Sequence, residues 1–521
     1  MAAEEHRTRA DLRPRAPGLR ALSLSSLVMA VALLGVFAMA ARVTMDTDTW
    51  WHLRAGQWMV ENRALPWVDH FSYTRLGAEW EYPGWPVQIL MYALYRALGP
   101  GGLNLWTAAM VTLALFFLWK TLSGGAFSRA FILILAAAVS GLYWAARPYL
   151  VTFVLAAVFL WALEAYRWQP GPQTRRRLLW LPPLMALWAN SHGGFAVGFL
   201  LWGVYLAGEL ASGLAQQWAA WRAGEAGAPS PRWVSGILRR GGAAWLLLIG
   251  LLLALGVCLN PYGPSMLAYP FKTVGIGALQ DYIQEWQSPD FHSLNVQPFA
   301  WLLILTLGVV GASRRRLALT DFLLVAGFLY MGLLAGRNIV LFALAAPPVL
   351  ARHLEPLVGS LQAQLGLRLD LDSPPPPRLA RLNWALLGVL VLAAALKAAL
   401  VFPPAVNEAA FRKSLPLEAV EYLRKNSPPG RLFNSYNWGG YLIWALPEYP
   451  VFVDGRTDLY NDEILDQWLQ AARAEPGWEA VLERWEARLV LMEPGSSLIK
   501  ALEAGDWRLL YQDELAVIYG K

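Results

Sequence analysis

The sequence predicts an α-helical polytopic membrane protein with about eleven spans, followed by a C-terminal α/β domain outside the membrane. Three observations predict this class. Of the 521 residues, 56% are hydrophobic and only 15% are charged, whereas soluble domains average about a quarter charged residues. The mean hydropathy is positive, +0.37. The apolar residues also fall into runs long enough to cross a bilayer. An ordinary soluble enzyme is therefore excluded, and the single cysteine, Cys258, excludes a disulfide scaffold.

The first apolar run is Leu22–Ala41, and it follows a basic segment, 1–20. That segment contains five arginines: Arg7, Arg9, Arg13, Arg15 and Arg20. The run is longer than the apolar core of a signal peptide, and further runs follow it. We therefore expect an uncleaved first span, with 1–20 as a cytoplasmic basic tail.

Ten further runs complete the predicted bundle, 21–402. They are Gly102–Leu122, Arg129–Ala146, Tyr149–Tyr166, Leu178–Asn190, Phe195–Leu210, Ala243–Leu259, Pro298–Gly311, Leu317–Ala335, Ile339–Leu350 and Trp384–Phe402. Arginine clusters such as 175–177 and 314–316 fall in the even-numbered connections, which the positive-inside rule places in the cytoplasm. We expect a multi-pass protein of the bacterial inner (cytoplasmic) membrane with its carboxy end outside.

This topology leaves two large outer loops, 42–101 and 260–297, and an extracytoplasmic domain, 403–521. The domain holds 18 acidic and 12 basic residues, although the whole chain has a net charge of +6. The positive charge therefore follows the membrane topology, and we expect no nucleic-acid partner. Apolar patterns alternate between strand and helix in the domain. Expected strands are 431–434, 451–453, 489–492 and a hairpin of 507–511 with 515–519, and expected helices are 417–425, 439–445, 463–474 and 498–504.

The first outer loop opens with an acidic motif close to the end of the first span. Asp46, Asp48 and His52 lie within seven residues of one another, interleaved with tryptophans. Carboxylates this close repel each other unless they share a proton or a cation, and their hard oxygens suit Mg²⁺ or Mn²⁺. A carboxylate or imidazole could also serve as a general base towards an acceptor hydroxyl. The alternative is structural, with Asp48 as the N-cap of the following helix.

Polar residues at the outer ends of other spans are candidate substrate-binding groups. Arg147 and Arg337 would suit a phosphate or diphosphate. His192 interrupts the run between two predicted spans, and Glu285 lies in the outer loop 260–297. Ionisable residues near membrane depth are functional candidates by default. For the arginines, the alternative is that they extend to the membrane interface.

In the outer domain, Trp438 and Tyr441 flank paired glycines at the start of an expected helix, and Asp454 and Arg456 follow an expected strand. We expect these four residues to bind substrate, with the domain closing a cavity from above and Trp438, Tyr441 and Arg456 facing the membrane. Glycines allow a backbone to approach a ligand closely, and sites often lie in such loops. Ordinary turn chemistry is the alternative.

These motifs give the chain a resemblance to the GT-C superfamily of membrane glycosyltransferases. Asp46-x-Asp48 matches the position of that superfamily's acidic motif in the first outer loop. Trp438-Gly439-Gly440-Tyr441, followed by Asp454-Gly455, is similar to the Trp-Trp-Asp-Tyr-Gly element of the oligosaccharyltransferase catalytic subunit. Here Asn437 replaces the first Trp, and the acceptor-reading aspartate is absent. The chain also resembles a group of uncharacterised bacterial membrane proteins that share Asp-x-Asp-x-Trp-Trp-His.

The resemblance implies a polyprenyl phosphate or diphosphate sugar as donor, with its lipid tail in the bundle. Arg147 or Arg337 would hold the phosphate. Asp46 or Asp48 would deprotonate the acceptor or bind a divalent ion, and a glycan, lipid or protein acceptor would dock under the outer domain. The predicted function is transfer of the sugar on the outer face of the membrane. Two alternatives are a transporter or flippase for a lipid-linked glycan and a non-catalytic envelope assembly protein.

Overall fold

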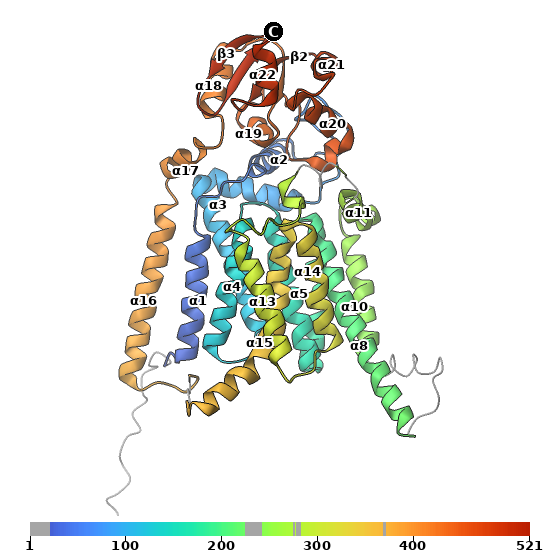
Figure 1. The fold of residues 1–521 in the computed structure, drawn as a ribbon, viewed down its shortest axis with the longest axis vertical. Helices are drawn as coiled ribbons and strands as arrows, with labels where there is room; N and C mark the ends of the chain where they lie inside the picture. The colour runs from blue at the N-terminus through green and yellow to red at the C-terminus, as the bar shows by residue number, and fades with distance from the viewer. Residues whose placement is uncertain (1–20, 225–241, 275–276, 278–282, 368–370) are drawn as a thin grey trace, which may run out of the picture.

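The computed structural model describes residues 21–224, 242–274, 277, 283–367 and 371–521. The predicted tail 1–20 lies outside the described residues. A bundle of roughly parallel helices carries a smaller mixed domain at one end, and the carboxy terminus lies in that domain (Figure 1). Large apolar side chains such as Leu392, Leu396 and Leu400 are exposed on the bundle, as expected of a surface that faces lipid.

Most of the predicted apolar runs form helices of the bundle. These are α1 (Leu24–Ala40), α3 (Trp85–Thr121), α4 (Ala126–Ser140), α5 (Tyr149–Trp168), α7 (Leu181–Ala189), α8 (Ala196–Arg222), α10 (Gly242–Val257), α13 (Gln297–Ala312), α14 (Leu319–Leu334), α15 (Ile339–Gln364) and α16 (Pro377–Leu400). In the described part of the chain, six helices are long and apolar enough to cross a membrane and four more are shorter apolar helices. The count of eleven spans is therefore not confirmed; α7 has only nine residues.

Helix α3 consists of two helical segments that meet at a break in the helix. Its backbone leaves helical geometry at Gly99 (φ +63°), directly before Pro100. The part after this break contains the predicted span Gly102–Leu122, and the part before it falls in the predicted loop 42–101. The first part lies with α2 (Thr49–Asn62) between the bundle and the outer domain (Figure 1).

Helix α15 continues beyond the predicted run, which ends at Leu350, so Arg352 is a buried helix residue and not a residue of the following connection. Its guanidinium pairs with Glu164 (2.6 Å) and Asp321 (2.5 Å), and Arg167 pairs with the same Asp321 (2.5 Å). Two acids and two arginines thus balance one another inside the helices.

The outer domain contains a four-stranded sheet in the order β1-β2-β4-β3. The strands are β1 (Arg431–Asn434), β2 (Ala487–Met492), β3 (Arg508–Gln512) and β4 (Val517–Gly520). The β1–β2 pair is parallel, the other two pairs are antiparallel, and the expected terminal hairpin is confirmed. The helices of this region are α17 (Pro404–Phe411), α18 (Leu417–Asn426), α19 (Tyr436–Ala445), α20 (Thr457–Ala472), α21 (Trp478–Arg484) and α22 (Ser497–Glu503). The expected strand 451–453 is wrong, because Val451 forms only single bridges.

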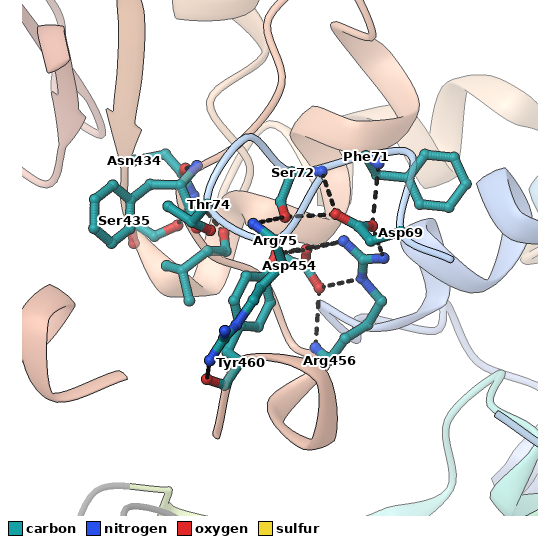
Figure 2. Close-up of polar contacts among 12 residues, drawn as sticks. Asp69, Phe71, Ser72, Thr74, Arg75, Asn434, Ser435, Asp454, Arg456 and Tyr460 are labelled. Atoms are coloured by element: carbon teal, nitrogen blue, oxygen red, sulfur yellow. Dashed lines mark hydrogen bonds and ion pairs between the residues drawn. The ribbon is translucent and has the colours of Figure 1, made fainter. Parts of the chain in front are cut away.

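One of those bridges joins the domain to the first outer loop. The backbone N–H of Tyr73 donates to the carbonyl of Val451 (3.1 Å), and the N–H of Val451 donates to the carbonyl of Phe71 (3.2 Å). The Thr74 hydroxyl donates to the carbonyl of Phe452 (2.6 Å). Main-chain contacts between segments almost 400 residues apart therefore fix the domain against the loop (Figure 2).

Candidate active site

Three carboxylates from two segments meet one guanidinium at the end of the bundle that carries the C-terminal domain. Arg147, just before α5, lies 3.3 Å from Asp46, 2.5 Å from Asp48 and 2.9 Å from Glu285. The two aspartates lie in the segment that connects α1 to α2, and Glu285 lies in the short helix η4 (Gln284–Trp286). The Arg147 side chain keeps 22% of its surface exposed, and each aspartate keeps 14%. The cluster is thus mostly buried but open to a ligand.

The local backbone aims Asp48 at this cluster. Asp48 occupies the N-cap position of α2, but its side chain makes no capping hydrogen bond. Its backbone N–H donates to Oδ1 of Asp46 (2.9 Å), which ties the two aspartates together. The capping alternative does not account for Asp48, since its carboxylate turns towards Arg147 instead.

The three carboxyl groups differ in acidity although they share one cation. Burial, with smaller contributions from the neighbouring carboxylates of Asp46 and Glu285, raises the pKa of Asp48 to about 7 despite the opposing effect of Arg147. Burial also raises the pKa of Asp46, whereas Arg147 lowers the pKa of Glu285. A group that titrates near neutral pH is well suited to accept a proton from a substrate.

Two histidines line the same region as neutral rings. Nδ1 of His52 lies 3.1 Å from the amide nitrogen of Gln88. Nδ1 of His192 accepts the backbone N–H of Gly194 (2.9 Å) and lies 3.0 Å from the Thr152 hydroxyl. Burial lowers the pKa of His52 well below its usual value and that of His192 to about 3.

Two cavities meet at the cluster. The first, here called the bundle cavity, has a volume of about 760 Å³ and is lined by residues that include Arg42, Asp46 and Trp144. The second, the domain cavity, has a volume of about 590 Å³ and lies between the bundle and the outer domain. Its lining includes Asp48, His52, His192, Tyr436 and Asp458. Arg147, Glu285 and Arg337 line both cavities, so the cluster forms part of the boundary between them.

Arg337 offers a positive charge to this boundary. It lies in the short helix η5 (Gly336–Asn338), and its guanidinium lies over the Trp286 ring at 4.7 Å from the ring centroid. Within the described part of the chain it forms no ion pair, in contrast to Arg147. An anion entering either cavity would meet a guanidinium that is not already paired with a carboxylate.

The four residues expected to bind substrate from the outer domain do not line the domain cavity. Trp438 is buried, and its indole N–H donates to the carbonyl of Ser414 (3.1 Å). Tyr441 packs edge-on against Trp50, with ring centroids 5.3 Å apart. These two side chains hold the domain together and onto α2, so their position does not support a binding role.

Asp454 and Arg456 are also structural. Arg456 pairs with Asp454 (2.8 Å) and with Asp69 of the first outer loop (2.5 Å), and all three side chains have no exposed surface. Tyr460 also donates to Asp454 (2.5 Å). Figure 2 shows how this network joins the loop to the domain. The expectation that Arg456 faces the membrane is therefore not supported.

The domain reaches the cavity through neighbours of the expected residues: Tyr436, Asn437, Gly455, Thr457 and Asp458. Gly455 touches the acidic motif directly, because a Cβ atom at this position would lie 1.8 Å from Oδ1 of Asp48. Only glycine therefore allows the domain backbone to approach Asp48 this closely. The sequence marked this turn correctly but not the residues within it that face the site.

The expected Mg²⁺ or Mn²⁺ ion has the right ligand chemistry in Asp46 and Asp48 but not the right arrangement. Both carboxylates face Arg147, whose guanidinium takes the place of a shared cation. In the described ranges no group of three or more His, Cys, Asp or Glu side chains could hold a metal ion. Metal binding stays a prediction that would require Arg147 to move.

Comparison with known proteins identifies the fold. No protein-family model matches the sequence, and no curated protein matches it. Among solved structures, the chain is similar to the oligosaccharyltransferase AglB of Archaeoglobus fulgidus in complex with an inhibitory peptide and a dolichol phosphate. The TM-score is 0.52 at 13% identity, covering 89% of this chain and 69% of AglB.

A second similar structure is the mycobacterial arabinofuranosyltransferase AftD, with a TM-score of 0.50 at 14% identity, covering 96% of this chain and 40% of AftD. The resemblance predicted from the sequence is therefore confirmed at the level of the fold, which this chain shares with an oligosaccharyltransferase and with part of an arabinofuranosyltransferase.

Proposed function

We propose that the chain is a membrane glycosyltransferase that moves a sugar from a polyprenyl phosphate or diphosphate donor to an acceptor. The observation that carries this proposal is the cluster of Asp46, Asp48, Glu285 and Arg147 at the boundary of two cavities. Two cavities that meet at one reactive group are what a transfer between two substrates needs, because both must reach the same atoms.

In the proposed reaction, Asp48 is the general base. The acceptor hydroxyl gives its proton to Asp48, and its oxygen forms a bond to the anomeric carbon of the donor sugar. The bond from that carbon to the phosphate oxygen breaks, and the lipid phosphate leaves with the electron pair. A carboxyl group with a pKa near 7 suits the proton transfer. Asp46 orients Asp48 through the backbone bond between them.

Arg337 is the proposed phosphate-binding group, since it lines both cavities and is free of carboxylate partners among the described residues. We assign the donor to the bundle cavity because the Arg42 guanidinium lines it together with that of Arg337. Arginine binds phosphate oxygens in a fixed fork geometry. Arg147 stabilises the negative charge that develops as the phosphate leaves.

A transporter or flippase is the second candidate. It would place charged residues inside the helices for a substrate path. The buried acids Glu164 and Asp321 are instead matched by Arg352 and Arg167. That pairing favours a structural role for the intramembrane charges and leaves the outer cluster as the reactive site. A purely non-catalytic assembly protein would have no need of a buried carboxyl group poised between two cavities.

The proposal is tested by deleting the gene in its host and comparing lipid-linked and surface glycans by mass spectrometry. In the deletion strain we expect the lipid-linked donor to accumulate and one sugar addition to disappear. Expression of the wild-type chain should restore that addition, and expression of Asp48→Asn should not. Identical glycans in the deletion strain and its parent would contradict the proposal. Fusing alkaline phosphatase after Lys521 tests the proposed location in a bacterial inner membrane, with the outer domain outside.

A further inference from the structure

We infer that the acceptor is a saccharide, bound through its hydroxyl groups in the domain cavity between Asp48 and Asp458. This inference rests on the proposed function, because it names the acceptor of that same site. Asp458 was not among the residues expected to bind substrate. Asp454 is held by a buried ion pair with Arg456, whereas Asp458 lines the domain cavity. Asp458 lines the cavity from the outer domain, whereas Asp48 lines it from the segment between α1 and α2.

The first supporting observation is the aromatic lining of the domain cavity. Trp51 and Tyr82 meet edge to face with ring centroids 5.2 Å apart, and Tyr436 and Trp468 meet at 5.7 Å. Trp51 belongs to α2 and Tyr82 to the first outer loop, whereas the second pair belongs to the outer domain. Flat, amphipathic rings from two parts of the chain suit the C–H faces of sugar rings and leave the hydroxyl groups to polar partners.

The second observation is that the polar lining is rich in hydrogen-bond acceptors. Asp458 accepts a hydrogen bond from the Tyr269 hydroxyl (3.0 Å) through Oδ2, which fixes the carboxylate beside the cavity. Burial and the carboxylates of Asp458 and Asp48 raise the pKa of Tyr82 well above its usual value, so a neutral hydroxyl lies near both acids. Carboxylates accept several hydrogen bonds at once, and sugar hydroxyls donate them.

The charge of the lining also suits a neutral ligand. The cavity is lined by three acids, Asp48, Glu285 and Asp458, and by three arginines, Arg147, Arg337 and Arg473, so neither sign is in excess. A neutral polyhydroxylated ligand can donate hydrogen bonds to the carboxylates and accept them from the guanidinium groups. A saccharide therefore fits the charge, the aromatic surface and the polar lining together.

The test uses cells of the deletion strain that express the intact wild-type chain or Asp48→Asn at equal levels. Envelope material is separated into saccharide, protease-released peptide and extracted lipid fractions, and each is examined by mass spectrometry and linkage analysis. We expect the Asp48-dependent sugar in glycosidic linkage to a saccharide hydroxyl. A sugar found on a peptide side chain or on a lipid would overturn this inference while leaving the proposed function intact. No Asp48-dependent sugar in any fraction would instead overturn the proposed function.

A second arm tests Asp458. Asp458→Asn keeps the shape but weakens hydrogen bonding to hydroxyls, so we expect transfer to fall on the order of tenfold while the lipid-linked donor accumulates. Tyr269→Phe removes the bond that fixes Asp458 and should give a smaller loss, which covers the case in which Asp458→Asn does not fold. Asp506→Asn, on the exposed surface of the domain, is the matched control. Wild-type transfer by both Asp458→Asn and Tyr269→Phe would overturn the assignment of Asp458.

Discussion

Two arginine–carboxylate clusters in the outer part of the molecule look alike in composition and differ in every property that bears on function. Arg147 meets Asp46, Asp48 and Glu285, and its side chain is 22% exposed. Arg456 meets Asp69 and Asp454, and no part of these three side chains is exposed. One cluster lines two cavities, and the other joins the outer domain to the first outer loop.

The difference lies in how completely each cation is matched. In the Arg456 cluster the guanidinium donates through three of its nitrogens to Asp454 and Asp69, and it packs over Trp80 at 4.9 Å. Such a network has no free capacity for a ligand. In the Arg147 cluster one guanidinium serves three carboxylates beside two cavities, and burial, with a smaller contribution from Asp46 and Glu285, raises the pKa of Asp48 to about 7. A buried carboxyl group with a shifted pKa beside a cavity is where chemistry is expected.

The largest predicted effect is loss of transfer in Asp48→Asn. Asparagine preserves the size of the side chain but cannot accept the acceptor proton, so we expect a decrease of about 10²- to 10⁴-fold. The measurement is the amount of transferred sugar per folded protein in membranes that contain the endogenous donor. Asp506→Asn, on the exposed surface of the domain and outside both cavities, is the control. Full activity in the Asn variants of both Asp46 and Asp48 would show that this cluster is not the reactive one.

The second prediction concerns the other cluster. Arg456→Met leaves two buried carboxylates without their cation, which typically costs about 3–5 kcal/mol of stability. We expect a large drop in the thermal unfolding temperature of the intact chain in detergent. Arg412→Met, which breaks an exposed pair with Glu408, should change that temperature little. An Arg456 variant that unfolds at the same temperature as wild type would contradict the claim that this cluster stabilises the fold.

The third prediction separates position from charge. An alanine at Gly455 would place a methyl group against Oδ1 of Asp48, and this flexible side chain can turn away without disturbing the fold. We expect roughly a tenfold loss of transfer with an unfolding temperature close to that of wild type. Gly308→Ala, where no atom lies within 4 Å of the added carbon, is the control. If Gly455→Ala lowered the unfolding temperature without lowering transfer, the role of Gly455 would be to stabilise the fold, as we propose for the Arg456 cluster.

The sequence predicted much of the fold because apolar runs and arginine clusters depend on local composition. Ten of the eleven runs became helices of at least fifteen residues, and the terminal hairpin formed where expected. The predictions that were wrong concern features that depend on contacts between residues far apart in the sequence. The predicted run ends at Leu350, two residues before Arg352, because the partners that allow this arginine to be buried, Glu164 and Asp321, lie on other helices.

The same reason limits what the sequence could say about the site. Asp46, Asp48, Arg147, Glu285 and Arg337 were selected individually, and the structure brings them together. The motif around Asp454 was also selected, but Asp69, the partner that buries Arg456, lies 387 residues away. Asp458 shared one signal with Asp454 and Arg456, its place after the same expected strand, and nothing in the sequence ranked it above them.

The smallest predicted effect is a pH dependence that the Arg147 cluster should show. Asp48 must be ionised to accept a proton, and its pKa is about 7, so transfer should fall by about threefold between pH 7.5 and 6.5 and level off at higher pH. His52 and His192 stay neutral across this range, and Asp46, Arg147 and Glu285 are the other charged groups that face Asp48. The measurement is the initial transfer rate in isolated membranes at constant ionic strength. In Asp48→Asn, the residual rate should lose this slope. A pH profile that keeps its slope in that variant would assign the titration to another group. The acidity of Asp48 would then no longer distinguish the Arg147 cluster from the Arg456 cluster.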